Sequence, residues 1–93
     1  MQWKLFADLS ERAGDDTVDV SVDAADPTVG DALDALLDSR PALRARVLTE
    51  DGAVVPDVNV LLDGTDVFVD GAGLETPVDE GAELALFPPV TGG

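Results

Sequence analysis

A single amphipathic helix flanked by short apolar runs is the feature that most constrains the fold of this chain. The apolar side chains of residues 28–38 recur at the spacing of one helical stripe, at Val29, Ala32, Leu33, Leu36 and Leu37. Thr28 is a good N-cap residue, and Asp31 stands at N3, as in a capping box. Such a stripe is buried when the helix covers one face of a sheet, which gives two layers around one core.

Strand-like segments occur on both sides of this helix. We expect strands at residues 3–7, 17–22, 58–62 and 83–87, with a further short strand at 67–69. Residues 13–16 predict a turn that joins the first two strands in a hairpin, and Asp63-Gly64 ends the third strand. Pro41 ends the main helix and starts a short second one through Val47. With 93 residues, the chain makes one α+β domain and has no room for a separate catalytic domain.

The charge of the chain limits its partners. Its formal net charge is −15, from 20 acidic and 5 basic residues. We expect neither nucleic acid nor an anionic membrane as a partner, because both would repel so acidic a chain. The acids are mostly aspartates spread over the whole sequence, and Lys4 is the only lysine. We interpret this composition as adaptation to a high-salt cytosol; an acidic face shaped for a basic partner is the alternative.

The residues that enzymes commonly use for catalysis are scarce. The sequence contains no cysteine and no histidine, so a nucleophile-and-base pair cannot readily be assembled. Asp15-Asp16 and residues 63–66 do not match the spacing of a calcium loop. We therefore expect no catalytic residues, no metal site and no cofactor. The sequence shows neither a signal peptide nor a bilayer-spanning run, which predicts a cytoplasmic protein.

The final residues carry the main chemical signal. Gly92-Gly93 stands at the end of the sequence Phe87-Pro88-Pro89-Val90-Thr91-Gly92-Gly93. Glycine lacks a Cβ and can enter a narrow tunnel, and the two prolines stiffen the approach to it. We expect a partner enzyme to adenylate the Gly93 carboxylate, so that sulfur or an amine can then attack the carbonyl. A frayed or artificial end without a function is the alternative.

We expect an exposed docking patch at the root of this tail. If Leu84 and Leu86 face the core, Ala85 and Phe87 face the other way, because strand side chains alternate. Phe6 joins them on the solvent face if the first and last strands are neighbours. Exposed aromatic side chains beside a reactive tail are typical of a partner-binding surface. The alternative is a bulge that turns one of the rings inward.

Two further residues are candidates for this surface. Side-chain parity leaves Leu61 and Leu62 open as an extension of the docking patch, and we assign Leu62 to it. Lys4 lies on the first strand and is the side chain available to accept a second copy of the chain by self-conjugation. The alternative for Lys4 is a solitary solvating lysine left by salt adaptation.

The sequence resembles the small β-grasp carriers: the molybdopterin synthase small subunit, thiamine-type sulfur carriers and ubiquitin-like small archaeal modifiers. The most specific match is the ending from Gly81 to Gly93, which is close to that of the molybdopterin synthase small subunit. Residues 5–7, 28–33 and 58–59 also match, and the high-salt composition favours a haloarchaeal modifier. The Asp-rich loop from Gly64 to Gly73 departs from the family pattern and leaves the fourth strand undecided.

The resemblance implies an α+β, ubiquitin-like β-grasp fold: a mixed four- to five-stranded sheet packed on one main helix, with a flexible Gly-Gly tail. It places the β-grasp domain at residues 1–87 and the reactive tail at residues 88–93. It also implies that a ubiquitin-activating-type adenylating enzyme, using ATP, activates Gly93. Phe87, Pro88, Pro89, Val90 and Thr91 would then contact that enzyme along the tail.

Three functions remain open at this point, and in each the chain is not itself an enzyme. It is a protein modifier, joined through Gly93 to lysines of target proteins by isopeptide bonds. Alternatively, it is a sulfur carrier whose Gly93 thiocarboxylate serves the large subunit of molybdopterin synthase, a role compatible with the first. In the third, it is a β-grasp binding module whose tail is inert.

Overall fold

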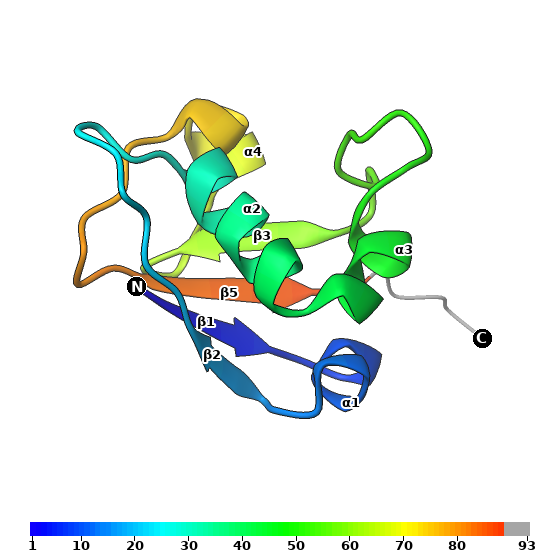
Figure 1. Ribbon diagram of the computed structural model, residues 1–93. Coiled ribbons are helices and arrows are strands. Elements are labelled where there is room, and N and C mark those ends of the chain that lie inside the picture. The colour runs from blue at the N-terminus through cyan, green and yellow to red at the C-terminus, as the bar shows by residue number, and fades with distance from the viewer. Residues whose placement is uncertain (89–93) are drawn as a thin grey trace.

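A mixed sheet forms one layer of the structure, and the long helix α2 lies across one face of it (Figure 1). This computed structural model describes residues 1–88, so every prediction about residues 89–93 lies outside the described residues. The strands are β1 (Gln2–Leu5), β2 (Thr17–Asp19), β3 (Asn59–Leu62), β4 (Thr65–Asp66) and β5 (Glu83–Phe87). The helical elements are α1 (Asp8–Ala13), α2 (Val29–Ser39), η1 (Pro41–Leu43), α3 (Arg44–Val47), α4 (Val67–Asp70) and η2 (Gly73–Glu75).

The strand order is β2-β1-β5-β3-β4, which places the last strand in the middle of the sheet. β1 and β5 run parallel, and the other neighbouring pairs are antiparallel. A parallel pair needs a long crossover connection, and the segment that contains α2 supplies it. The predicted α+β architecture, with a mixed sheet packed on one main helix, is confirmed.

Helix α2 begins as the sequence predicts. The Asp31 backbone N–H donates to Thr28 Oγ1 over 3.2 Å, and the Thr28 backbone N–H donates to Asp31 Oδ2 over 3.1 Å. This reciprocal pair completes the capping box and satisfies two backbone donors at the end of the helix. All members of the predicted apolar stripe are buried: Val29, Ala32, Leu33, Leu36 and Leu37.

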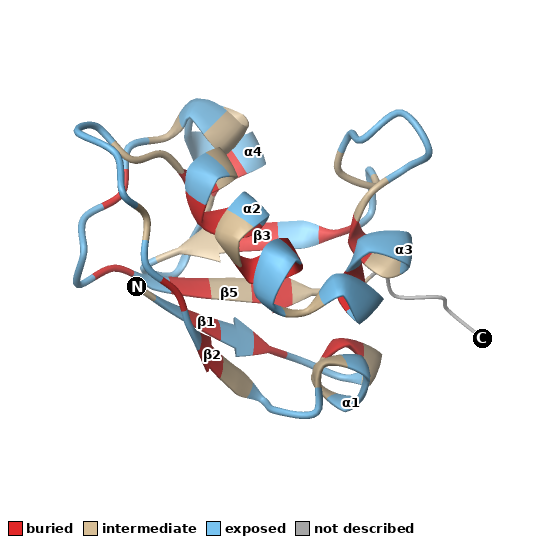
Figure 2. Cartoon of the chain, in the orientation of Figure 1, coloured by how far each residue is buried: buried red, intermediate tan, exposed pale blue. Residues whose placement is uncertain are grey.

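The core lies between α2 and the facing side of the sheet (Figure 2). Trp3 and Leu5 of β1 are buried with Leu84 and Leu86 of β5, as the alternation of strand side chains predicts. The Trp3 indole Nε1 donates a buried hydrogen bond to the Ala32 carbonyl over 3.0 Å. This bond joins the first strand to helix α2 and fixes the position of the helix on the sheet.

The connection between the first two strands differs from the prediction. The predicted pairing of the first two strands is confirmed, because β1 and β2 pair antiparallel, but the connection between them also contains helix α1, which the sequence did not predict. Leu9 is fully buried, which anchors α1 to the core, and Gly14 ends the helix at a φ of 83°. The sequence pattern did not predict α1, because the helix is short and mostly polar and Leu9 is its one buried residue.

The prediction of a strand at residues 67–69 is wrong, because this segment forms the single-turn helix α4 (Val67–Asp70). The Phe68 backbone N–H donates to Asp66 Oδ1 over 2.9 Å, which caps the turn. Val67 is buried, whereas Phe68 and Val69 are exposed, a pattern that a strand with alternating faces would not give. The fourth strand is instead the pair Thr65–Asp66, reached from β3 through Asp63 and Gly64 at φ of 49° and 89°.

The Trp3 hydrogen bond makes a direct prediction about stability. We expect Trp3→Phe to lower the free energy of unfolding by about 1–3 kcal/mol, because it removes both buried volume and the bond to Ala32. Urea unfolding followed by circular dichroism at constant salt measures the change. Val69→Ala, at a largely exposed position, is the control and should change stability by less than about 0.5 kcal/mol. An equally small effect of Trp3→Phe would contradict this account of the core.

Candidate functional site

The face of the sheet turned away from α2 is the candidate docking surface. Strand register decides its members, because residues paired across neighbouring strands point to the same side. Lys4 of β1 stands beside Ala85 of β5, and Asn59 of β3 stands opposite Phe87. We call this surface the outer face, and its central residues are Lys4, Asn59, Leu61, Glu83, Ala85 and Phe87, with Phe6 just beyond β1.

Two phenylalanine rings stack at one end of the outer face. The centroids of Phe6 and Phe87 lie 4.2 Å apart, and their planes differ by 9°. Phe6 remains 38% exposed, and Phe87 is half-buried, so neither ring is turned into the core. The predicted juxtaposition of these two side chains is confirmed, and the bulge that would have turned one inward is absent. Their role in docking remains a prediction.

Leu62 does not belong to this surface, which corrects the assignment made from the sequence. Leu61 stands opposite Ala85, whereas Leu62 stands opposite the buried Leu84. Leu62 therefore lies on the helix side, where it packs against the core. Leu61 is the residue that extends the outer face, and only the register with β5 distinguishes the two. The prediction that Ala85 faces outward is confirmed by the same register.

Lys4 is held on the outer face by an ion pair with Glu83 of the neighbouring strand. Both side chains remain about half-exposed, at 48% and 51%. An ion pair this exposed contributes little to stability, and it leaves the ammonium group within reach of solvent. Whether Lys4 accepts a second copy of the chain remains a prediction.

Backbone strain lies directly after Phe6. Ala7 adopts a φ of 54° and a ψ of −131°, a region that residues with a Cβ rarely occupy. The Leu9 N–H donates to the Phe6 carbonyl over 3.1 Å and closes this bend at the start of α1. The sharp turn ends β1 at Leu5 and leaves Phe6 beside Phe87.

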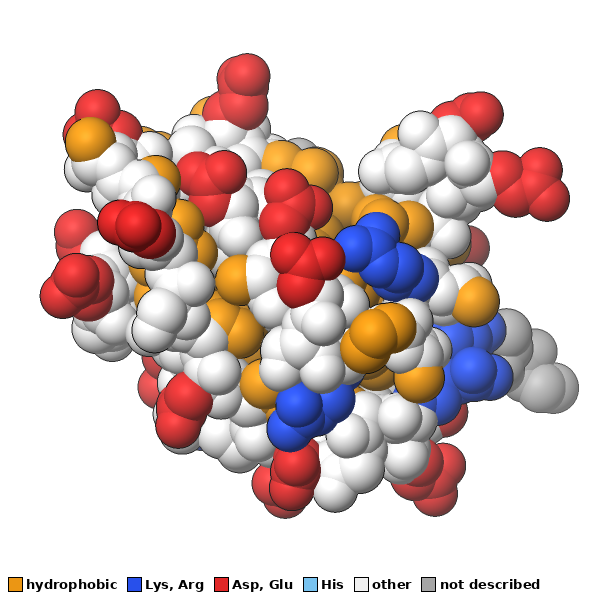
Figure 3. Space-filling model, viewed as in Figure 1, with side chains coloured by type: hydrophobic (Ala, Val, Ile, Leu, Met, Phe, Trp, Pro, Cys, Tyr) orange, Lys and Arg blue, Asp and Glu red, His pale blue; other side chains and the backbone are white. Residues whose placement is uncertain are grey.

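All five lysine and arginine side chains are engaged in ion pairs. Lys4 pairs with Glu83, and the four arginines, Arg12, Arg40, Arg44 and Arg46, pair with Asp8, Asp15 and Asp38. The basic side chains in view in Figure 3 gather toward the side that carries α1 and α3, whereas acids are spread over the visible face. Within residues 1–88, the ion pairs of these five side chains engage only four acids: Asp8, Asp15, Asp38 and Glu83.

Asp8 binds two of these arginines. Arg46 Nε lies 2.7 Å from Asp8 Oδ2, and Arg12 Nε lies 3.6 Å from the same oxygen. The hydrogen bond from Arg46 lowers the pKa of Asp8 below its ordinary value of 3.8. Because the pKa is lowered, the pair stabilises the fold at neutral pH and loses that contribution as the pH falls through the folded-state pKa.

Several predicted site residues lie outside the described part of the chain. Pro89, Val90, Thr91, Gly92 and Gly93 follow Pro88, the last described residue, which is half-buried. Among residues 1–88, no three potential ligands converge to hold a metal ion. Within the same residues, no helix is both long and apolar enough to cross a membrane.

The central position of β5, the single covering helix and the Pro-Pro-Val-Thr-Gly-Gly sequence after β5 together define a ubiquitin-like carrier of the β-grasp class. Comparison with known proteins identifies the family: the ThiS family model matches residues 3–93, and the chain belongs to the ThiS family. Its two full-length relatives are named as small archaeal modifier proteins.

Two relatives from Haloferax volcanii match this chain along its whole length. It is 54% identical to small archaeal modifier protein 1 over 93 residues, which cover 100% of both chains. It is 40% identical to small archaeal modifier protein 3, covering 100% of this chain and 98% of that one. The crystal structure of small archaeal modifier protein 1 superimposes with a TM-score of 0.89, covering 100% of this chain and 98% of that chain.

The stacked rings make a testable prediction. We expect a double-mutant cycle of Phe6→Ala and Phe87→Ala to show a coupling of about 0.5–1.5 kcal/mol in the free energy of unfolding, because each ring packs against the other. Chemical unfolding of the wild type, both single variants and the double variant measures it. Phe6→Ala combined with Phe68→Ala is the control, whose effects should add. Strict additivity for Phe6 and Phe87 would show that the stack contributes nothing.

Proposed function

We propose that this chain is a protein modifier whose Gly93 carboxylate is joined to lysine side chains of target proteins. The observation that carries the proposal is the full-length similarity to two small archaeal modifier proteins, which extends through Gly92-Gly93. The ThiS family match to residue 93 also includes this ending. The stacked Phe6 and Phe87, beside the strand that leads to the tail, supply a surface for a partner.

The proposed chemistry has two steps, and a partner enzyme catalyses both. A Gly93 carboxylate oxygen attacks the α-phosphorus of ATP, pyrophosphate leaves, and an acyl-adenylate forms. The ε-amine of a target lysine then attacks the carbonyl carbon, AMP leaves, the nitrogen loses a proton, and an isopeptide bond results. The chain itself contains neither cysteine nor histidine, so it acts as the reactant. Gly92 and Gly93 keep the carbonyl accessible because they carry no side chains.

The proposed roles of the other site residues follow the path of the chain. Phe6, Leu61, Ala85 and Phe87 of the outer face dock on a ubiquitin-activating-type adenylating enzyme. Residues 88–91 guide the two glycines into its active site, and the prolines limit the conformations that binding must fix.

A second function is favoured by the ThiS family match itself. In this role a hydrosulfide ion attacks the carbonyl carbon of the same adenylate, AMP leaves, the sulfur loses its proton, and Gly93 carries a thiocarboxylate. The ending Phe87-Pro88-Pro89-Val90-Thr91-Gly92-Gly93 resembles the molybdopterin synthase small subunit, so the large subunit of that synthase is the proposed acceptor. The two functions share the first step and can coexist in one protein.

Conjugation can be detected by mass spectrometry of tagged protein from native cells. The last basic residue is Arg46, so trypsin would leave the whole segment from Val47 to Gly93 on a target lysine. Thr91→Arg shortens this remnant to Gly-Gly. We expect Gly-Gly remnants on lysines of other proteins, and none when Gly92 and Gly93 are deleted, although that variant should retain wild-type stability. A chain that never appears in species heavier than itself would contradict the modifier function.

Sulfur transfer predicts a change in the intact mass of freshly isolated protein. Part of the population should be heavier by the difference between one sulfur and one oxygen atom. An alkylating reagent should then add its mass to this heavier species alone. A chain that lacks Gly93 should never contain the heavier species. Cells without the gene that still make active molybdoenzymes would exclude the molybdopterin function.

A further inference from the structure

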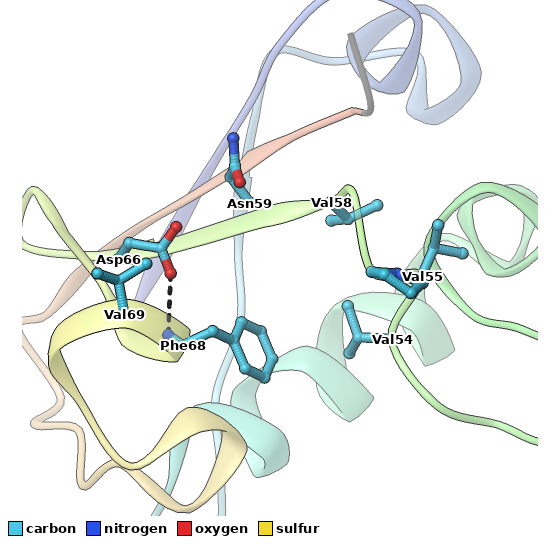
Figure 4. A pocket seen from close by; sticks show the side chains of 8 residues that line it. Val54, Val55, Val58, Asn59, Asp66, Phe68 and Val69 are labelled. Atoms are coloured by element: carbon cyan, nitrogen blue, oxygen red, sulfur yellow. Dashed lines mark hydrogen bonds between the residues drawn. The ribbon is translucent and has the colours of Figure 1, made fainter. Parts of the chain in front are cut away.

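An apolar groove of about 320 Å³ lies beside β3, at the β4 edge of the sheet. One wall comes from the loop before β3, through Val54 and Val55, and the other from α4, through Phe68 and Val69. Figure 4 shows the ring of Phe68 turned toward the side chain of Val54. We call this hollow the edge groove. Sequence patterns missed it because they assigned residues 67–69 to a strand.

Both walls are held by hydrogen bonds, so the groove exists before a partner arrives. Val55 donates its N–H to the Val47 carbonyl over 2.8 Å, which ties the loop wall to the end of α3. On the other side, Asp66 caps α4, and a Cβ built on Gly73 would lie 3.3 Å from two carbons of the Phe68 ring. The ring thus packs against Gly73 and is restrained in its orientation.

The groove runs along a part of β3 that lacks a neighbouring strand. β4 pairs only with Leu61 and Leu62, and the chain turns into α4 at Val67. Within residues 1–88, no strand therefore continues β4 alongside Asn59 and Val60. Strand edges of this kind accept an extended peptide by backbone pairing, and neighbouring pockets select its side chains.

Charge and exposure indicate the chemistry of the occupant. Phe68 and Val69 are 49% and 75% exposed, and they are two of the three large apolar side chains exposed in the described part of the chain. Asp66 lines the groove, Asp57 and Asp70 adjoin it in sequence, and no lysine or arginine is among its lining residues. Apolar patches of this kind mark interaction sites, and the acidic surroundings favour a basic partner.

We propose that the edge groove binds an extended, basic polypeptide segment of a partner protein. Its aliphatic side chains, at alternate positions, enter between Val54 and Phe68. Its backbone adds a strand beside Asn59 and Val60, and its lysines or arginines face Asp66 and the neighbouring acids. This binding is non-covalent and does not depend on the chemistry of Gly93.

A labelled peptide tests the proposal. The probe is a nine-residue peptide with valine at alternate positions and lysine between, followed by fluorescence anisotropy at constant salt. We expect saturable binding to the wild type and a loss of affinity of about tenfold or more in Phe68→Ala and in Val69→Asp. Val69→Asp changes a largely exposed position and keeps the test valid if Phe68→Ala is poorly folded. Phe6→Ala, on the outer face, is the matched control and should bind as the wild type does.

Two altered peptides test the mode of binding. Proline at the central positions removes backbone donors and should abolish binding, and glutamate in place of lysine should do the same through repulsion. Undiminished binding by Phe68→Ala and Val69→Asp, or by the proline peptide, would overturn the proposal. Light scattering gives a further test. If the chain alone forms a dimer, and if Phe68→Ala and Val69→Asp turn it into a monomer, a second copy of the chain is the occupant and the proposal is overturned.

Discussion

The parallel pairing of β1 with β5 is the constraint on which the rest of the structure depends. It brings the first and last strands together at the centre of the sheet, although the whole domain separates them in sequence. On the inner side it aligns Trp3 with Leu84 and Leu5 with Leu86, and these side chains meet the apolar stripe of α2. On the outer side the same register leaves Phe6 beside Phe87. This one pairing therefore positions the side chains of the core and the aromatic pair at the end of β5.

The composition of the chain bears on the chemistry proposed for it. It has no histidine or cysteine, and every lysine and arginine is engaged by a carboxylate. The proposed function therefore gives the chain the part of a substrate, with the Gly93 carboxylate as the reactive group. The many acidic side chains repel one another, and this repulsion weakens where salt screening is strong.

Sequence patterns predicted the elements whose signals are local or periodic. The capping box of Thr28 and Asp31 and the five-residue stripe of α2 appear as expected, and β5 has the predicted bounds. The outward position of Ala85 and the meeting of Phe6 with Phe87 followed from alternation once the two strands were assumed to be neighbours. These predictions succeeded because side chains return to the same face about every 3.6 residues in a helix and every second residue in a strand.

The failures arose where tertiary contacts override local preference. α1 exists because one leucine, Leu9, reaches the core, and α4 exists because Asp66 caps a turn that buries Val67 alone. The sequence could not decide which of Leu61 and Leu62 faces outward, because both are apolar and adjacent. The pairing with β5 decides it. The sequence did not predict the edge groove, because Phe68, which forms its aromatic wall, belongs to α4.

The exchange of labelled pyrophosphate into ATP, catalysed by an adenylating enzyme of the ubiquitin-activating type from the same cells, tests the central claim most directly. Exchange should require this chain, disappear when Gly93 is removed, and need a higher concentration of the Phe6→Ala variant to reach half its maximum. An enzyme that activates other carriers but shows no exchange with the folded chain would contradict the claim that its terminal carboxylate is the reactive group.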